Sequence, residues 1–197
     1  MSDAQLIEKF RSGDIGCFNT LVYRWQQRLY NFILRYSGDR DEAHDLCQLA
    51  FIKAHRSLGQ LRDPEKFSSW IYQLTLNVCR DEFKKNRRRQ RHVTGSLEET
   101  EIHPGDTRIA GVIPPLESEI CRNDLRDMLN KALQTLSEEQ RLVVIMKNYQ
   151  GMTFAEIARA LNISENTAKS RLYYALANLK NVFEKWNIPR ESISHEM

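Results

Sequence analysis

The sequence Thr153-Phe-Ala-Glu-Ile-Ala-Arg-Ala-Leu-Asn-Ile-Ser-Glu-Asn-Thr-Ala-Lys-Ser-Arg-Leu172 predicts two capped helices joined by a short turn. Thr153 and Glu156 have the spacing of a capping box, which starts the first helix. Asn162 tolerates the left-handed backbone that ends this helix, and Ser164 can cap the second one. Because so short a turn does not let the helices lie parallel, the pattern predicts a helix-turn-helix.

The two faces of this helix pair differ in chemistry. Apolar residues recur at helical spacing on the side that should face inward, namely Ile157, Ala158, Leu161, Ile163, Ala168 and Leu172. The outward side of the second helix is polar and basic, which suits a helix that reads a DNA groove, and it carries Asn166, Thr167, Lys169, Ser170, Arg171, Tyr173 and Tyr174. An ordinary helical hairpin with a solvated face has the same pattern, so this segment alone leaves both interpretations open.

Length and charge point to folded domains with a nucleic-acid partner. The chain has 197 residues, of which 41% are hydrophobic, and this admits one large or two small domains. The net charge of +3 is unevenly distributed. Residues 93–120 hold six acidic side chains against Arg108 alone, so this segment carries about −5 and the rest about +8. Basic folded parts with an acidic connector favour a nucleic-acid partner over an acidic metabolite.

The cysteines and the apolar runs exclude several other classes. The cysteines are far apart and show neither a disulfide framework nor zinc-ribbon spacing: Cys17, Cys47, Cys79 and Cys121. His44 and Cys47 could share a helix face, but two ligands do not close a metal site. No apolar run approaches the roughly 18 residues that span a bilayer, and the first residues do not resemble a signal peptide. We therefore expect a cytoplasmic protein with reduced thiols, no membrane insertion and no cofactor.

The periodicity divides the chain into two helical blocks. Residues 1–91 predict a helix that stops at Ser37-Gly38, a second from about Asp41 to Leu58, and a third long helix that starts near Asp63-Pro64. Residues 92–121 are rich in glycine and proline and predict a linker, which is either a solvated tether or a mimic of nucleic acid inside a basic channel. Residues 122–186 form the second block, and residues 187–197 a C-terminal tail.

One run in the second block is ambiguous. Leu142-Val-Val-Ile-Met146 is apolar and partly β-branched, so periodicity alone could indicate a buried strand. Ser137 and Gln140 just before it have capping-box spacing, which favours a helix.

The third long helix of the first block carries two features. Its end is strongly basic and suits contacts with phosphates, although such charge runs are often simply solvated. Upstream, Phe67, Trp70, Leu74 and Asn77 recur every three or four residues and so project from one side. This side is either a core face whose amide finds a backbone partner, or a pocket that stacks and hydrogen-bonds an unpaired base.

Five segments resemble the extracytoplasmic-function (ECF) subgroup of bacterial RNA polymerase sigma factors: residues 45–54, 67–77, 136–140, 151–158 and 167–172. One motif of this kind is weak evidence, but several in the right order are strong. The resemblance implies an all-α protein with two small helical domains. The first block corresponds to the sigma region 2 helical bundle and the second to the sigma region 4 helix-turn-helix, joined by a flexible acidic linker.

The resemblance also implies roles for particular residues. Docking on the clamp helices of the polymerase largest subunit falls to Asp45, Gln48, Phe51 and Lys53. Recognition and melting of the minus-10 element fall to Phe67, Ser68, Trp70, Asn77, Arg80 and Lys84. The outward residues 166–174 named above read the minus-35 element. The implied partners are core RNA polymerase, including its flap, promoter DNA and an anti-sigma factor.

Several positions depart from the pattern of this subgroup. Asn162 replaces the usual turn glycine and Ala168 the usual valine. Leu49 stands where an acidic residue is usual, which makes the contact with the clamp more apolar. Tyr174 stands where arginine is common, so a bidentate guanine contact is lost and the promoter sequence stays open.

Two other classes compete with this interpretation. A stand-alone helix-turn-helix regulator would bind duplex DNA tightly without polymerase and would need a dimerisation surface. A nucleic-acid enzyme would need converging carboxylates, a metal set or an activated nucleophile. Asp81 and Glu82 are adjacent and therefore diverge on a helix, so we expect no enzymatic activity.

Overall fold

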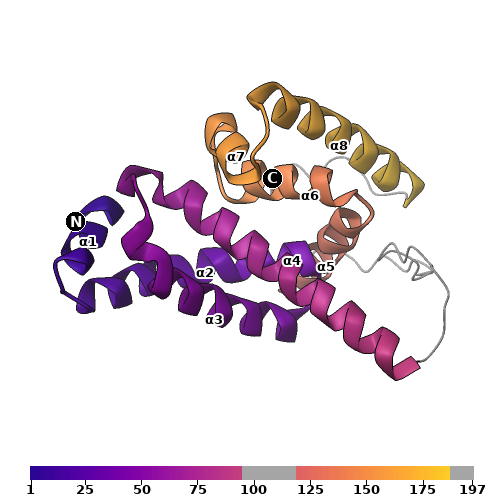
Figure 1. The fold of residues 1–197 in the computed structure, drawn as a ribbon. Coiled ribbons are helices and arrows are strands. Elements are labelled where there is room, and N and C mark those ends of the chain that lie inside the picture. The colour runs from indigo at the N-terminus through magenta and orange to yellow at the C-terminus, as the bar shows by residue number, and fades with distance from the viewer. Residues whose placement is uncertain (95–118, 187–197) are drawn as a thin grey trace.

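The computed structural model describes residues 1–94 and 119–186, with side chains in 1–89 and 125–186. All regular elements in these ranges are helical (Figure 1), as the sequence predicts. The described helices include residues 92–94 and 119–121 of the predicted linker. Residues 95–118 of that linker and the predicted tail 187–197 lie outside the described residues. No helix in the described part is long and apolar enough to cross a membrane.

The N-terminal domain is a bundle of four helices. These are α1 (Asp3–Arg11), α2 (Gly16–Ser37), α3 (Arg40–Ser57) and α4 (Phe67–Thr94), with short 3-10 turns η1 (Leu58–Gln60) and η2 (Pro64–Lys66) before α4. Gly38 ends α2 with a left-handed backbone at φ 82°, and Asp39 then caps α3 through the Glu42 amide. Asp63 and Pro64 open η2, so the turn expected there leads directly into α4.

Helix α1 closes the open end of this bundle. The sequence patterns did not delimit it, although Ser2 and Gln5 form a complete capping box at its start. Leu6 and Ile7 are fully buried, and the Arg11 guanidinium donates to the Leu61 carbonyl in the segment that precedes α4. Helix α1 therefore supports the connection between α3 and α4 from outside.

The C-terminal domain contains the predicted helix-turn-helix. Its elements are α5 (Glu119–Gln134), α6 (Glu138–Val144), the π-helix η3 (Ile145–Tyr149), α7 (Phe154–Leu161) and α8 (Glu165–Lys185). The Thr153–Glu156 capping box is present, Asn162 is left-handed at φ 54°, and Ser164 accepts from the Thr167 amide. The local chemistry that predicted these two helices and their turn is thus confirmed.

The ambiguous apolar run is helical, but it changes type. Leu142, Val143 and Val144 end α6, and Ile145 and Met146 begin η3. In η3 the Gln150 amide donates to the Ile145 carbonyl at 3.1 Å, five residues back. Such wide turns hold one extra residue and often mark functional positions.

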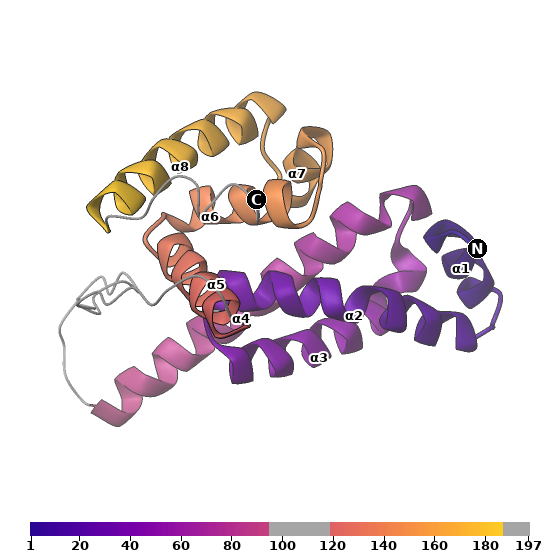
Figure 2. The same ribbon diagram turned by 180° about the vertical axis from the view of Figure 1, so that it is seen from behind.

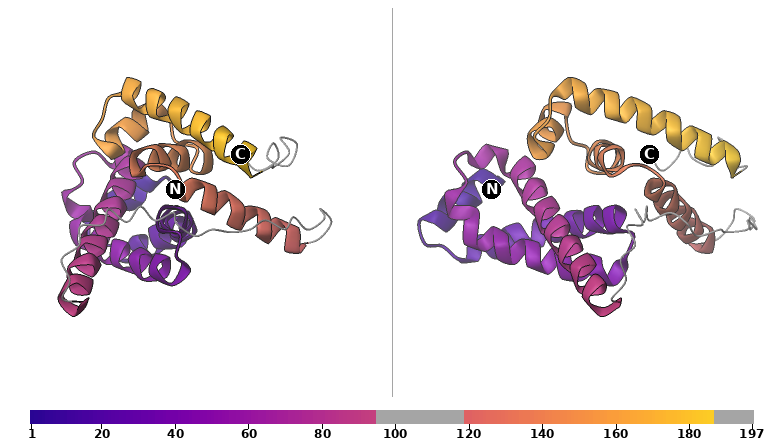
Figure 3. Two further views of the ribbon diagram at one scale, coloured as in Figure 1. Left: turned by 90° about the vertical axis from the view of Figure 1, so that its right-hand side faces the viewer. Right: turned by 45° about the vertical axis from the view of Figure 1, so that its right-hand side comes forward.

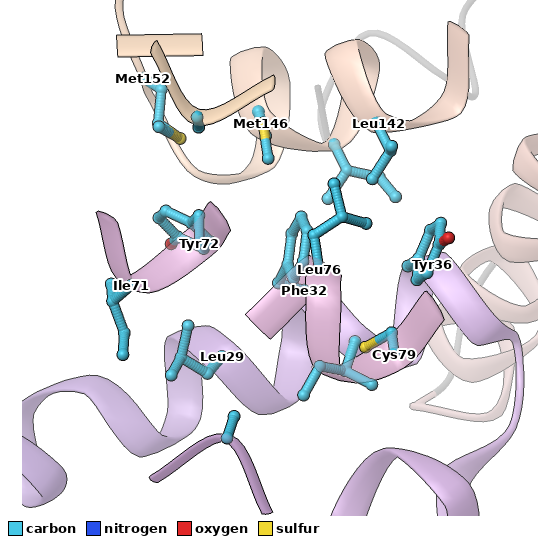
Figure 4. Packing of buried hydrophobic residues seen from close by; sticks show 14 of the residues in the cluster. Leu29, Phe32, Tyr36, Ile71, Tyr72, Leu76, Cys79, Leu142, Met146 and Met152 are labelled. Carbon is cyan, nitrogen blue, oxygen red and sulfur yellow. The ribbon is translucent and has the colours of Figure 1, made fainter. Parts of the chain in front are cut away.

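The two domains share a continuous hydrophobic core. Helices α6 and α7 lie over α2 and α4 when the molecule is seen from the front, from behind and from the side (Figure 1, Figure 2, Figure 3). Figure 4 shows Leu142, Met146 and Met152 pointing toward α2 and α4. The facing residues from the first domain include Phe32, Tyr36, Tyr72 and Leu76. The sequence predicted two separate blocks and gave no sign of this direct packing.

Candidate nucleic-acid interface

A shallow pocket lies between α3 and α4. Its volume is about 270 Å³, and it is lined by Lys53 from α3 and by Trp70, Gln73, Leu74 and Asn77 from α4. The ammonium group of Lys53 is held 3.4 Å from a carboxylate oxygen of Asp81. The pocket therefore combines a partly exposed indole ring, two amide groups and a cation, which together can stack on a flat polar ring and hydrogen-bond its edge.

The structure corrects one residue of the predicted minus-10 set. Phe67 is only 3% exposed, and its ring meets Trp25 edge-on at 5.4 Å. Phe67 is therefore a core residue that lies behind Trp70, and its ring is not available to a DNA base. The apolar spacing from Phe67 to Leu74 combined positions that face the core with positions that face the pocket.

Gln73 is the residue that the sequence patterns missed. It is exposed and lies four residues before Asn77, so the two side chains are neighbours on one face of α4. The available signal was an amide one helical turn before a candidate base-reading amide, and apolar periodicity does not detect a polar residue of this kind.

The remaining predicted minus-10 residues lie in different surroundings. Ser68 is half-buried, and Lys84 is exposed. The exposed basic residues Lys84, Lys85 and Arg87–Arg89 lie along the part of α4 that extends beyond the bundle (Figure 1). A row of cations on a projecting helix suits contact with a phosphate backbone.

Arg80 is engaged across the domain boundary. Its Nε donates to the Glu138 carboxylate at 2.8 Å, and the Tyr36 hydroxyl donates to the same oxygen at 2.9 Å. Burial raises the pKa of Glu138, but the hydrogen bonds from Arg80 and Tyr36 and the nearby positive charges outweigh it, so this pKa lies below its usual value. Burial, followed by the charge of Glu138, raises the pKa of Tyr36. At neutral pH an ionised carboxylate thus binds a cation and a phenol.

The predicted polymerase-docking residues lie on α3. Asp45 and Gln48 are exposed, and the opposite side of the helix is buried at Leu46, Ala50 and Ala54, as the sequence predicted. Phe51 is half-buried, and Lys53 belongs to the pocket described above. Ile52, which was not among the predicted residues, is 49% exposed and adds apolar surface one helical turn after Gln48.

The outward side of α8 is accessible. Among the predicted minus-35 residues, Asn166, Lys169, Ser170, Tyr173 and Tyr174 are exposed, with 72% of Tyr173 and 61% of Tyr174 accessible. The side chains of the two others already contact neighbouring residues. Thr167 is half-buried beside the cap Ser164, and Arg171 pairs with Glu139 of α6 at 2.7 Å.

The inward side of the helix-turn-helix is only partly as predicted. Ile157, Ala158 and Ala168 are buried, but Leu161, Ile163 and Leu172 are half-buried.

Two buried thiols and two adjacent carboxylates were the candidates for chemistry in the N-terminal domain. Burial raises the pKa of Cys47 to about 11 and that of Cys79 to about 12, so both are protonated thiols at neutral pH. Among the described residues, no three histidine, cysteine or acidic side chains converge to hold a metal. Asp81 pairs with Lys53, whereas Glu82 pairs with Lys85, so these adjacent carboxylates are directed to different cations.

Two family models match the chain in this order: Sigma-70 region 2 over residues 21–89 and Sigma-70, region 4 over residues 126–179. The first covers α2 to α4 with the pocket, and the second covers the helix-turn-helix. The RNA polymerase sigma-H factor of Pseudomonas aeruginosa is 29% identical over 173 residues, which cover 88% of this chain and 89% of that protein. The ECF RNA polymerase sigma-E factor of Escherichia coli is 27% identical over 183 residues, which cover 92% and 94%.

Solved structures share the fold. CnrH in complex with the cytosolic domain of CnrY superimposes with a TM-score of 0.68 at 20% identity, over 93% of this chain and 97% of that one. The sigma factor RpoE of Bartonella quintana, in complex with the anti-sigma factor NepR, has a TM-score of 0.66 at 22% identity, over 85% and 96%. Both family models thus fall on the two domains that carry the pocket and the helix-turn-helix, and the chain belongs to the sigma-70 family as an ECF-type sigma factor, a non-enzymatic protein that directs promoter-specific initiation by RNA polymerase.

Proposed function

We propose that the pocket between α3 and α4 captures an unpaired base of the minus-10 element and that α8 reads the minus-35 element in the major groove. The observation that carries the first assignment is the pair of amides, Gln73 and Asn77, one helical turn apart beside the partly exposed Trp70. Stacking of a base on an aromatic ring contributes about 1–3 kcal/mol. An amide can form a bidentate contact with a base edge, which supplies the discrimination that stacking lacks.

The pocket requires melted DNA, and this makes the free chain a weak promoter binder. Extruding a base from a duplex costs a few kcal/mol, which a shallow pocket alone does not supply. We therefore expect specific promoter binding only after the chain has joined core polymerase. A mobility-shift assay with and without core enzyme tests this. Nanomolar, sequence-specific binding by the free chain would instead support the stand-alone regulator.

We further propose that α3 docks on the clamp helices of the polymerase largest subunit and that the C-terminal domain contacts the flap. The support is the division of α3 into a buried side and a polar side that exposes Asp45 and Gln48. An anti-sigma factor is proposed as a further partner, because one fold that this chain resembles was solved in complex with such a protein.

Replacing Asp45 and Gln48 together with alanine should reduce affinity for core polymerase by about tenfold or more, because truncated interface residues that matter cost over 1 kcal/mol each. The fold should survive, since exposed substitutions change stability by about 0.5 kcal/mol or less. Pull-down with core enzyme and a thermal melt measure the two effects. A matched control is Asn19→Ala at an exposed position of α2, which should change neither. Unchanged pull-down with a collapsed melting temperature would make the two residues structural.

Arg171 and Tyr173 should separate positioning on DNA from reading of its sequence. Arg171→Ala should weaken binding to all promoters alike and lower the salt slope by about one unit, because an arginine that contacts a phosphate releases about one counterion on binding. Tyr173→Ala should shift the minus-35 preference and leave the slope near that of the wild type. Holoenzyme binding at several salt concentrations measures both. Since Arg171 also pairs with Glu139, an unchanged slope in Arg171→Ala would show that this pair is its whole role.

A further inference from the structure

The contact between the two domains is centred on one carboxylate. Glu138, at the start of α6, accepts from Arg80 Nε at 2.8 Å and from the Tyr36 hydroxyl at 2.9 Å, and we call these three residues the Glu138 cluster. Arg80 and Tyr36 belong to the N-terminal domain, so every bond of the cluster crosses the domain boundary. The Arg80 side chain is 43% exposed and that of Glu138 is 47% exposed, so the pair is accessible to competing ions.

Other polar contacts also join the two domains. The Tyr72 hydroxyl donates to Gln150 Oε1 at 2.7 Å, and Gln134 donates to the Arg35 carbonyl at 3.0 Å. The Arg35 guanidinium lies over the Tyr149 ring at 4.2 Å. Between these polar contacts Leu142, Met146 and Met152 are buried and point toward α2 and α4 (Figure 4). The boundary therefore combines particular polar pairs with buried apolar side chains, which makes the packing of the two domains specific.

This closed packing is incompatible with simultaneous reading of two promoter elements. By their names the elements are centred about 25 base pairs apart, which corresponds to roughly 80 Å of duplex. A compact body of this size is only about 40 Å across. The domains must therefore separate before the pocket on α4 and the outward side of α8 reach their elements together.

We propose that the closed packing is a self-inhibited state in which the Glu138 carboxylate binds Arg80 and so takes the place of a DNA phosphate. We call this contact the latch. The inhibition of DNA binding rests on the proposed assignment of Arg80 to the minus-10 element; the latch itself does not. Polymerase or DNA then activates the chain by binding the open form, and its apparent affinity is reduced by the fraction of molecules that are closed.

The test compares Glu138→Gln with Glu139→Gln in the full chain. The two substitutions remove the same charge at neighbouring positions of α6, but Glu139 pairs with Arg171 inside its own domain. Spectroscopic labels at exposed Asn19 and Asn181 report the distance between the domains, and small-angle scattering reports overall size. Glu138→Gln should raise the open population about fivefold, as expected for a partly exposed charged hydrogen bond, and Glu139→Gln should leave it unchanged. The affinity for core polymerase should rise by up to the same factor.

A charge exchange provides the second variant. Arg80→Glu places two carboxylates together and should open the chain, and Arg80→Glu combined with Glu138→Arg should close it again. A wild-type chain that is already extended in solution would overturn the proposal, and so would an equal response to Glu138→Gln and Glu139→Gln. The distances are measured without DNA or polymerase. If they behave as expected but the holoenzyme shows no minus-10 preference, the promoter assignment fails and the latch stands.

Discussion

Replacing Arg141 with alanine should lower the free energy of unfolding by about 3 kcal/mol, because hydrogen bonds to charged groups contribute about 1.5–3 kcal/mol and their buried partners would be left unpaired. Arg141 is only 7% exposed. Its guanidinium donates to the carbonyls of Tyr36 at 2.9 Å, Leu136 at 3.1 Å and Gln134 at 3.3 Å, and also to the Gln134 side chain. For a chain of this length the loss corresponds to a fall in melting temperature of about 6–12 °C.

Calorimetry or denaturant unfolding measures this effect, and two variants define it. Arg126→Ala removes an exposed arginine from α5 and should change stability by about 0.5 kcal/mol or less. Arg141→Lys retains the charge but loses the planar fork of donors, so it should fall between the wild type and the alanine variant. If Arg141→Ala and Arg126→Ala have the same melting temperature, water replaces the lost donors and the carbonyls do not depend on the arginine.

Asn77→Ala should abolish the preference of the holoenzyme for one base of the minus-10 element. The expected loss is about 1–3 kcal/mol of discrimination, the usual contribution of a bidentate amide contact with a base. Transcription from a pool of randomised promoters measures the preference at each position. Asn77 is exposed in the pocket, so the substitution should leave the melting temperature near that of the wild type.

Gln73→Ala provides a matched comparison, because it removes an amide from the same pocket one turn earlier. If both amides read the base, each variant should relax the same position. If only Gln73→Ala relaxes it, the reading amide is Gln73. A minus-10 preference that survives both substitutions would remove the pocket from the proposed mechanism.

The elements that the sequence predicted well are those whose causes are local. Thr153 and Glu156 lie three residues apart, and Asn162 and Ser164 determine the turn by their own backbone and side-chain preferences, so neighbouring residues suffice. Gly38 is a similar case, since its left-handed conformation ends α2 without help from distant residues.

The features that were missed depend on distant residues. The orientation of Phe67 is determined by Trp25 on another helix, and periodicity within α4 carries no information about it. The closed packing joins Tyr36 to Glu138 across 102 positions. Within its own block Tyr36 is a buried residue of α2 and Glu138 is an acidic residue in the first turn of α6, so no pattern in either block indicates that they meet.

The π-helix η3 makes the placement of α7 and α8 depend on the number of residues before them. In an α-helix each residue advances the chain by about 100° and 1.5 Å, so a turn that holds one extra residue shifts the rotational phase of everything after it. Deleting a single residue between Val144 and Gln150 would restore α-helical phase and turn the end of this helical segment by about 100°. The chain would then leave η3 in another direction, and α7 and α8 could not keep all their present contacts with η3 and α6. In this domain, deleting a residue within η3 should therefore disturb the arrangement of the helices more than most single substitutions do.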